Sequence, residues 1–246
     1  MKILIGSGAL HHHFPTFRKP KDLDYFSDVK KFDSQIIEGV VNELIPAPDW
    51  WIGNSEIALP EEILNIKASH LFWTRRKNHQ HINDIEFLMS KGFQLYDRLY
   101  YKLIEHWREI HGPPVRPDFT KTPDQFFDDY VQRKLHHDEV HLIINSDPTF
   151  KKILVGNGTV EISEDLFKKL TFEEQLSVVR EEVYVLSYER WNDKETTSPT
   201  LTYMRTLNHF ISCLAPEWLT LFALKNYKEL KKPLINYKTI IESYEK

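Results

Sequence analysis

The sequence contains little cysteine, little glycine and no long hydrophobic run. Its 246 residues include one cysteine, Cys213, and eight glycines. A single cysteine excludes an intramolecular disulfide, which fits a reducing compartment. No apolar stretch approaches the roughly 20 residues that a membrane-spanning helix needs, and the first residues lack the pattern of a signal peptide. We therefore expect a cytoplasmic protein that has no membrane partner.

An excess of charge of one sign is also lacking. The formal net charge is −4 and the isoelectric point is about 6.3. Such a chain has no global attraction for nucleic acid, so a nucleic-acid partner requires a local basic patch. The most compact basic run is Arg75-Arg76-Lys77. Hydrophobic residues make up 41% and charged residues 28%, which is ordinary for a globular protein.

The first 95 residues alternate between strand and helix patterns. Apolar runs bounded by turn residues predict strands, and apolar residues at spacings of three and four predict helices. The expected strands are residues 2–5, 23–26, 34–37 and 40–45, the last two joined as a hairpin by Glu38-Gly39. The expected helices are residues 10–17, 60–73 and 81–92.

The rest of the chain has helical patterns and few strand signals. A helix is expected over residues 96–110, followed by a proline-rich, linker-like segment over residues 111–123. Further helices are expected at residues 126–144, 164–169, 171–191, 201–210 and 216–225. The sequence thus predicts an α+β protein, with a small mixed β-sheet domain over residues 1–95 and an all-helical half over residues 96–246.

The opening stretch contains the residues best suited to chemistry. An apolar run leads into Gly6-Ser7, and a later strand carries Asp22 and Asp24. Two carboxylates one residue apart on a strand point to the same side, and carboxylate oxygens suit a magnesium ion. A D-x-D tripeptide alone is also common at a solvated strand edge. The order of the elements is what predicts a cleft that holds phosphates and a metal.

This order of strand, Gly-Ser turn, short helix and D-x-D strand resembles the nucleotidyltransferase superfamily. The resemblance is to DNA polymerase beta-like and minimal nucleotidyltransferases of the bacterial and phage kind, over residues 1–95. It implies that Gly6 and Ser7 bind the triphosphate, that Asp22 and Asp24 bind the metal, and that a neighbouring strand supplies a third carboxylate.

The third carboxylate departs from the family pattern. Glu43 stands where the family usually has aspartate, and Glu38 is the other candidate. The resemblance continues through Lys67 and Lys77, which would neutralise phosphates as point charges. The alternative interpretation of each lysine is an ordinary solvated helix face.

The resemblance implies transfer of a nucleoside monophosphate from a nucleoside triphosphate (NTP) to an acceptor. The expected cofactor is magnesium or manganese, and the acceptor can be RNA, a protein or a small molecule. A second hypothesis is a catalytically lapsed nucleotide-binding or interaction module of the phage or defence type. The glutamate at position 43 favours this second hypothesis.

A second cluster lies in the helical half. On a helix, His137 and His141 share one face, and Asp138 and Glu182 could complete a shell for zinc or iron. This arrangement suggests a metal-dependent hydrolase as a third hypothesis, although the sequence is not H-E-x-x-H. The structural alternative places one imidazole against a buried glutamate and leaves the others in solvent.

Overall fold

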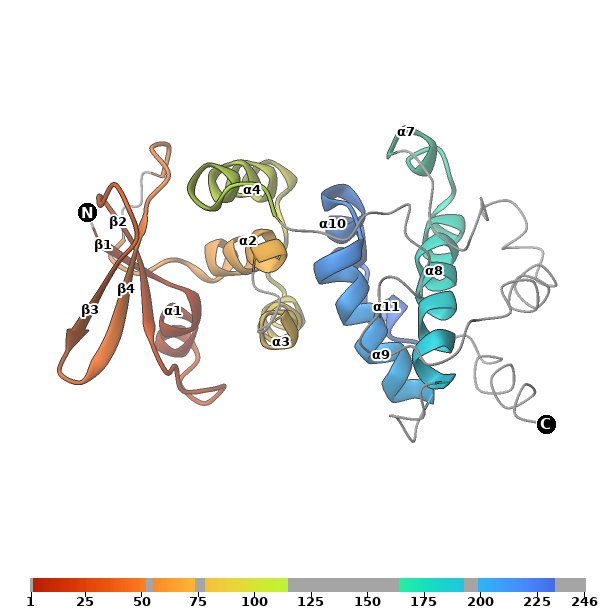
Figure 1. The fold of residues 1–246 in the computed structure, drawn as a ribbon, viewed down its shortest axis with the longest axis horizontal. Coiled ribbons are helices and arrows are strands. Elements are labelled where there is room, and N and C mark those ends of the chain that lie inside the picture. Colours follow the sequence, from red (N-terminus) through yellow and green to blue (C-terminus); the bar gives the residue numbers. More distant parts are fainter. Residues whose placement is uncertain (1, 52–54, 74–77, 115–163, 193–198, 233–246) are drawn as a thin grey trace. The chain divides into compact units, whose positions relative to one another are not determined.

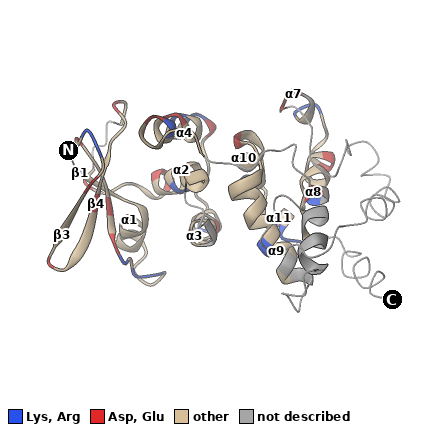
Figure 2. Ribbon diagram, in the orientation of Figure 1, with Lys and Arg blue, Asp and Glu red and all other residues tan. Residues whose placement is uncertain are grey.

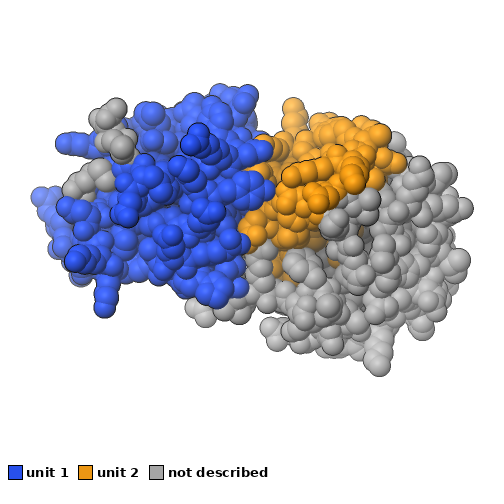
Figure 3. Space-filling model, turned by 90° about the horizontal axis from the view of Figure 1, so that it is seen from above, with its two compact units in different colours: residues 1–115 blue, residues 116–246 orange. Residues whose placement is uncertain are grey.

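The chain divides into two compact units, residues 1–115 and residues 116–246 (Figure 3). The structure is a computed structural model that describes residues 2–51, 55–73, 78–114, 164–192 and 199–232. Each unit is described by itself below.

The first unit contains a four-stranded mixed sheet (Figure 1). Its strands are β1 (Lys2–Ile5), β2 (Leu23–Ser27), β3 (Asp33–Ile37) and β4 (Val40–Pro46). Their order in the sheet is β1-β2-β4-β3. The β2–β4 pair is parallel, and the other two pairs are antiparallel. The predicted small mixed sheet is therefore confirmed.

One helix comes directly after strand β1 in the sequence, and the other described helices of this unit come after strand β4. They are α1 (Gly6–His13), α2 (Pro60–His70), α3 (Asn78–Ser90) and α4 (Asp97–His111), and a 3-10 turn, Leu71–Trp73, extends α2. Helix α2 begins as the sequence predicts, since Pro60 occupies the first turn and the Glu62 carboxylate accepts the Leu59 N–H at 2.7 Å.

Apolar side chains from three strands share one face of the sheet. The strand register aligns Ile3 with Phe26, and Phe26 with Ile45. All three are buried, and Phe26 is fully enclosed. The Trp107 ring of α4 lies 5.6 Å from the Phe26 ring, centre to centre. This face of the sheet and the helices that cover it form the hydrophobic core.

Helix α1 differs from its prediction. The expected helix spanned residues 10–17, but the observed helix begins at Gly6 and ends at His13. Pro15 accounts for the early end, because a proline disfavours helical backbone in the residue before it. The Gly-Ser pair, expected to be a turn before the helix, forms the first turn of the helix itself.

The division between the units falls within the segment predicted to be linker-like, residues 111–123. The sequence pattern placed the helix over residues 96–110 in the helical half, whereas α4 belongs to the first unit, which ends at residue 115. The Trp107 indole N–H of α4 donates to Ser69 Oγ of α2 at 2.9 Å. Tertiary packing of α4 on α2 therefore decides where the unit ends.

In the described part of the second unit, the regular elements are all helical. They are α7 (Glu164–Phe167), α8 (Phe172–Asn192), α9 (Pro199–His209), a π-helical turn (Phe210–Leu214), α10 (Glu217–Lys225) and α11 (Tyr227–Leu230). The α+β class is confirmed. Among the described residues, no helix combines the length and the apolar character required to cross a membrane.

Replacement of Phe26 tests the core of the first unit. Phe26→Ala removes a fully enclosed ring, so we expect a loss of about 3–5 kcal/mol in the free energy of unfolding. Urea unfolding followed by tryptophan fluorescence measures the loss. Ile36→Ala is the control, because Ile36 is 75% exposed on β3 and its loss is expected to be within about 0.5 kcal/mol. Equal effects of both variants would contradict this description of the core.

Candidate functional site

One pocket of the first unit collects the residues that the opening stretch singled out. It has a volume of about 270 Å³. Among its lining residues are Gly6, Ser7, Asp22, Asp24, Glu43 and Lys67. These come from the start of α1, the start of β2, the middle of β4 and helix α2. The residues that the resemblance assigns to the nucleotide site therefore line one pocket, as far as the structure describes them.

The start of α1 lies against Asp24 because β1 and β2 are antiparallel. The register aligns Ile5, the last residue of β1, with Asp24. Gly6 follows at once with φ +62°, and a Cβ there would overlap the Asp24 carboxylate. The first N–H groups of a helix have no partners within the helix and carry partial positive charge. Glycine at position 6 thus brings the Asp24 carboxylate against the start of a helix.

Glu43 stands beside Asp24 on the neighbouring parallel strand. The register of β2 and β4 aligns the two residues, so their side chains leave the same face of the sheet. Glu38 lies in the hairpin turn instead, with φ +51°. Five residues of extended strand span about 16 Å, so the structure leaves Glu43 as the candidate for the third carboxylate.

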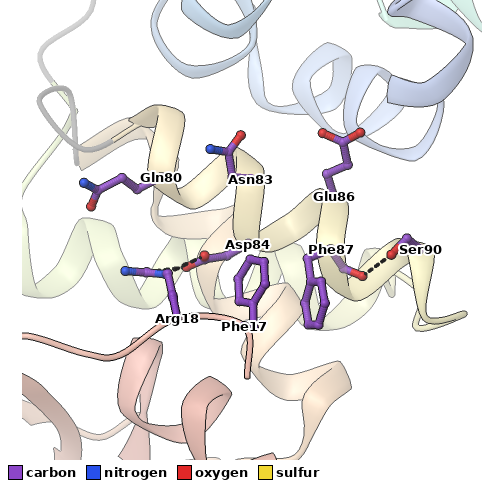
Figure 4. Close-up of a pocket in the computed structure, with 8 residues that line it drawn as sticks. All are labelled: Phe17, Arg18, Gln80, Asn83, Asp84, Glu86, Phe87 and Ser90. Carbon is purple, nitrogen blue, oxygen red and sulfur yellow. Dashed lines mark hydrogen bonds and ion pairs between the residues drawn. The ribbon is translucent and has the colours of Figure 1, made fainter. Parts of the chain in front are cut away.

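A buried carboxylate joins the cationic side chains of the site. Asp84, on α3, is 1% exposed and lies 2.8 Å from Lys67 Nζ. Arg18 donates to both Asp84 oxygens, from Nε at 2.8 Å and from Nη2 at 2.6 Å (Figure 4). The same Nη2 donates to Ser7 Oγ at 2.6 Å. Asp84 therefore fixes one cation from α2 and another from the α1–β2 loop beside the first turn of α1.

Arg18 also separates the pocket from a second, more open one. This second pocket has a volume of about 590 Å³ and is lined by Phe17, Phe87 and polar residues of α3 (Figure 4). Arg18 and Gln80 line both pockets. The Arg18 guanidinium, with a side chain 32% exposed, is therefore accessible at the boundary between them.

The pocket combines both signs of charge. Basic residues gather in the α1–β2 loop (Figure 2), where Arg18, Lys19 and Lys21 line the pocket. Burial lowers the pKa of Lys67, while the carboxylates of Asp84 and, more weakly, Asp24 oppose that shift. The cationic side of the pocket suits phosphate oxygens, and the carboxylate side suits a metal ion.

The donor set fits magnesium. Among the described residues, no three His, Cys, Asp or Glu side chains are grouped closely enough to hold a metal ion by themselves. Magnesium does not need such a group, because proteins commonly bind it through one or two carboxylates, waters and the phosphates of a substrate. Asp22 and Asp24 are the residues that would supply the carboxylates here.

Several predicted site residues cannot be compared with the structure. Lys77 lies outside the described residues, as do His137, Asp138 and His141. Glu182, the fourth member of the histidine cluster, is buried in α8 at 6% exposure. The metal-dependent hydrolase of the third hypothesis therefore stays a prediction.

The sequence reasoning missed the roles of Arg18 and Asp84. A signal for the ion pair was present, since Lys67 falls between Leu64 and Leu71 on the buried stripe of α2. A lysine on such a stripe needs a buried partner. Helix α3 offers Asp84 among its buried residues, but which helices pack together is not visible in the pattern.

Comparisons with known proteins assign the chain to a family. Residues 62–243, well over half of the chain, match the model of a family described as a domain of unknown function (DUF7275). The chain belongs to this family. Residues 2–46 match a second model, also described as a domain of unknown function (DUF7277). No curated protein and no solved structure matches the chain.

The pocket draws on both matched segments of this DUF7275 protein. Asp24 and Glu43 lie in the segment that matches DUF7277, and Lys67 lies in the DUF7275 segment. Asp84, which binds Lys67, is also in the DUF7275 segment. Neither matched segment alone contains all the charged groups of the site.

Glycine 6 can be tested against a matched glycine of the same unit. Both Gly6 and Gly39 have positive φ, so alanine at either position adds about 1–2 kcal/mol of backbone strain. Only at position 6 would the new Cβ also displace a side chain, that of Asp24. We expect Gly6→Ala to be at least about 1 kcal/mol more destabilising than Gly39→Ala in urea unfolding. Equal losses would contradict the close approach of Gly6 and Asp24.

Asp84→Asn tests the buried ion pairs. The substitution keeps the side-chain shape but leaves Lys67 and Arg18 without their shared anion, so we expect a loss of about 3–5 kcal/mol in the free energy of unfolding. Glu105→Gln, at an exposed position of helix α4, is the control and should change stability by less than about 0.5 kcal/mol. The double variant Lys67→Met/Asp84→Asn should recover part of the loss, because it removes both buried charges. A neutral effect of Asp84→Asn alone would argue against the network.

Proposed function

We propose that this DUF7275 protein is a magnesium-dependent nucleotidyltransferase. It transfers a nucleoside monophosphate from an NTP to the hydroxyl group of an acceptor. The observation that carries the proposal is the pocket that joins Asp22, Asp24 and Glu43 to the start of α1 and to four basic side chains. This combination matches what phosphoryl transfer needs, which is mainly positioning and charge stabilisation.

The cationic side of the pocket would hold the triphosphate. Ser7 Oγ and the first N–H groups of α1 can donate hydrogen bonds to phosphate oxygens. Arg18 is already directed at Ser7 by Asp84, and its Nη1 takes no part in these bonds, which leaves donors for a phosphate. Lys67 adds positive charge beneath them. The phosphates would thus lie between helix α1 and helix α2.

The carboxylate side would activate the reacting groups. Asp22 and Asp24 would hold magnesium, which supplies charge neutralisation at the phosphates when it is bound. Glu43 would accept the proton of the acceptor hydroxyl. The acceptor oxygen then forms a bond to the α-phosphorus, the bond from that phosphorus to the β-phosphate oxygen breaks, and pyrophosphate leaves. The alignment of Glu43 with Asp24 supports these roles, because it brings the two side chains next to each other.

Label transfer tests this function. The protein is incubated with magnesium, each labelled NTP and RNA, protein or small-molecule acceptors. Asp22→Asn and Asp24→Asn are each expected to lower the transfer rate at least about a hundredfold, because each removes a metal ligand worth several kcal/mol. Asp33→Asn, on the exposed edge strand, should leave the rate unchanged.

The outcomes separate the first two hypotheses. Transfer that survives both aspartate substitutions would sink the proposed function. Wild-type protein that binds an NTP in calorimetry but transfers no label to any acceptor would support the lapsed binding module instead. Wild-type protein that binds no NTP would contradict both.

A further inference from the structure

A group of aromatic rings around His70 reaches the edge of the pocket. His70 is at its centre, with ring centres 4.4 Å from Trp107, 5.3 Å from His111 and 6.5 Å from Trp73, at interplanar angles of 37°, 26° and 16°. Phe32 stacks on His111 at 4.9 Å and 28°. We call these five residues the ring stack. It joins the β2–β3 loop, the end of α2, the 3-10 turn and the end of α4.

The ring stack is only partly core. Trp107 is buried, whereas His70 and Trp73 are partly exposed and His111 is exposed. Phe32 leaves 48% of its surface in solvent. His70 and Trp107 line the same pocket as Asp24 and Glu43. Two rings of the stack, those of His70 and Trp107, therefore border the pocket directly.

The histidines of the ring stack are neutral near pH 7. Burial among the surrounding rings is the main cause that lowers the pKa of His70 to about 3, and charge on His111 and Lys67 acts in the same direction. Burial also lowers the pKa of His111. The two Nε2 atoms are 3.3 Å apart, so one imidazole donates and the other accepts. This wall is uncharged, in contrast to the carboxylates and cations around Asp24.

A nucleotide has the same division between a charged end and a flat neutral end. Its phosphates fit the side formed by Ser7, Arg18 and Lys67, and its base fits an uncharged aromatic wall. Bases stack on aromatic side chains and histidine in sites without sequence preference.

We infer that the ring stack is a nucleobase-binding wall and that the base packs against the His70 ring. The inference rests on the proposed function and deepens it, since it assigns one class of ligand to one side of the pocket. The base has two possible sources, the NTP itself or the terminal nucleotide of a nucleic-acid acceptor. The chemistry of recognition is the same for both.

Calorimetry with three ligands tests the inference. The ligands are magnesium-ATP, magnesium-tripolyphosphate, which has no base, and a short single-stranded oligonucleotide. His70→Ala is expected to weaken binding of ATP, of the oligonucleotide or of both about tenfold, which corresponds to about 1.4 kcal/mol of lost stacking. Tripolyphosphate binding should stay unchanged. Weaker binding of ATP identifies the NTP base as the occupant, and weaker binding of the oligonucleotide identifies the acceptor base.

Two further variants separate stacking from a merely structural effect. His70→Phe retains a flat ring and should restore most of the affinity that His70→Ala loses. His12→Ala removes an exposed histidine of α1 that does not line the pocket and should change no affinity. Thermal melting of each variant reports whether the fold persists.

The results that would overturn the nucleobase wall differ from those that would overturn the proposed function. His70→Ala that weakens ATP and tripolyphosphate equally, or that weakens neither ATP nor the oligonucleotide, would overturn the nucleobase wall alone. Wild-type protein that binds neither ATP nor tripolyphosphate would overturn the proposed function. If oligonucleotide binding still depended on the His70 ring in that case, the nucleobase wall would stand and the proposed function would not.

Discussion

The site depends on one buried carboxylate. Asp84 is almost without solvent contact and holds Lys67 and Arg18 through contacts of 2.6–2.8 Å. A buried ammonium group without a partner would lose its proton, because burial already lowers the pKa of Lys67. The pair with Asp84 opposes that loss and keeps positive charge in the pocket. Through Arg18, the same carboxylate also fixes a hydrogen bond to Ser7 at the start of α1.

The sheet supplies the opposite charge at a fixed position. Antiparallel pairing of β1 with β2 places the start of α1 beside Asp24, and parallel pairing of β2 with β4 places Glu43 beside it. Both carboxylates stand on the face that carries Phe26 and Ile45 two residues further along. Because the core fixes the apolar members of each strand, it also fixes the direction of the carboxylates. The charged site is in this sense an extension of the core packing.

Much of the first unit could be predicted because its signals are local. Strand alternation, the proline at the start of α2 and the glycines after α3 and α4 depend on a few neighbouring residues each. The prediction for α1 placed the helix four residues too far along, although Pro15 was a local sign of its end. The pattern also grouped the helix over residues 96–110 with the helical half. Assigning α4 to the first unit depends on the contact of Trp107 with Phe26 and Ser69, which are distant in the sequence.

The sequence alone determined which residue types are present for phosphate and metal chemistry. Gly6-Ser7, Asp22, Asp24 and Glu43 were visible as a local order of strand, helix and strand. Only the tertiary structure decided that Arg18, Lys67 and Asp84 form one network and that His70 stands in a wall of aromatic rings. Those contacts join residues tens of positions apart, and they depend on which helices pack together. Local periodicity shows that a helix has a buried face, whereas the choice of partner for that face is made by packing across the whole unit.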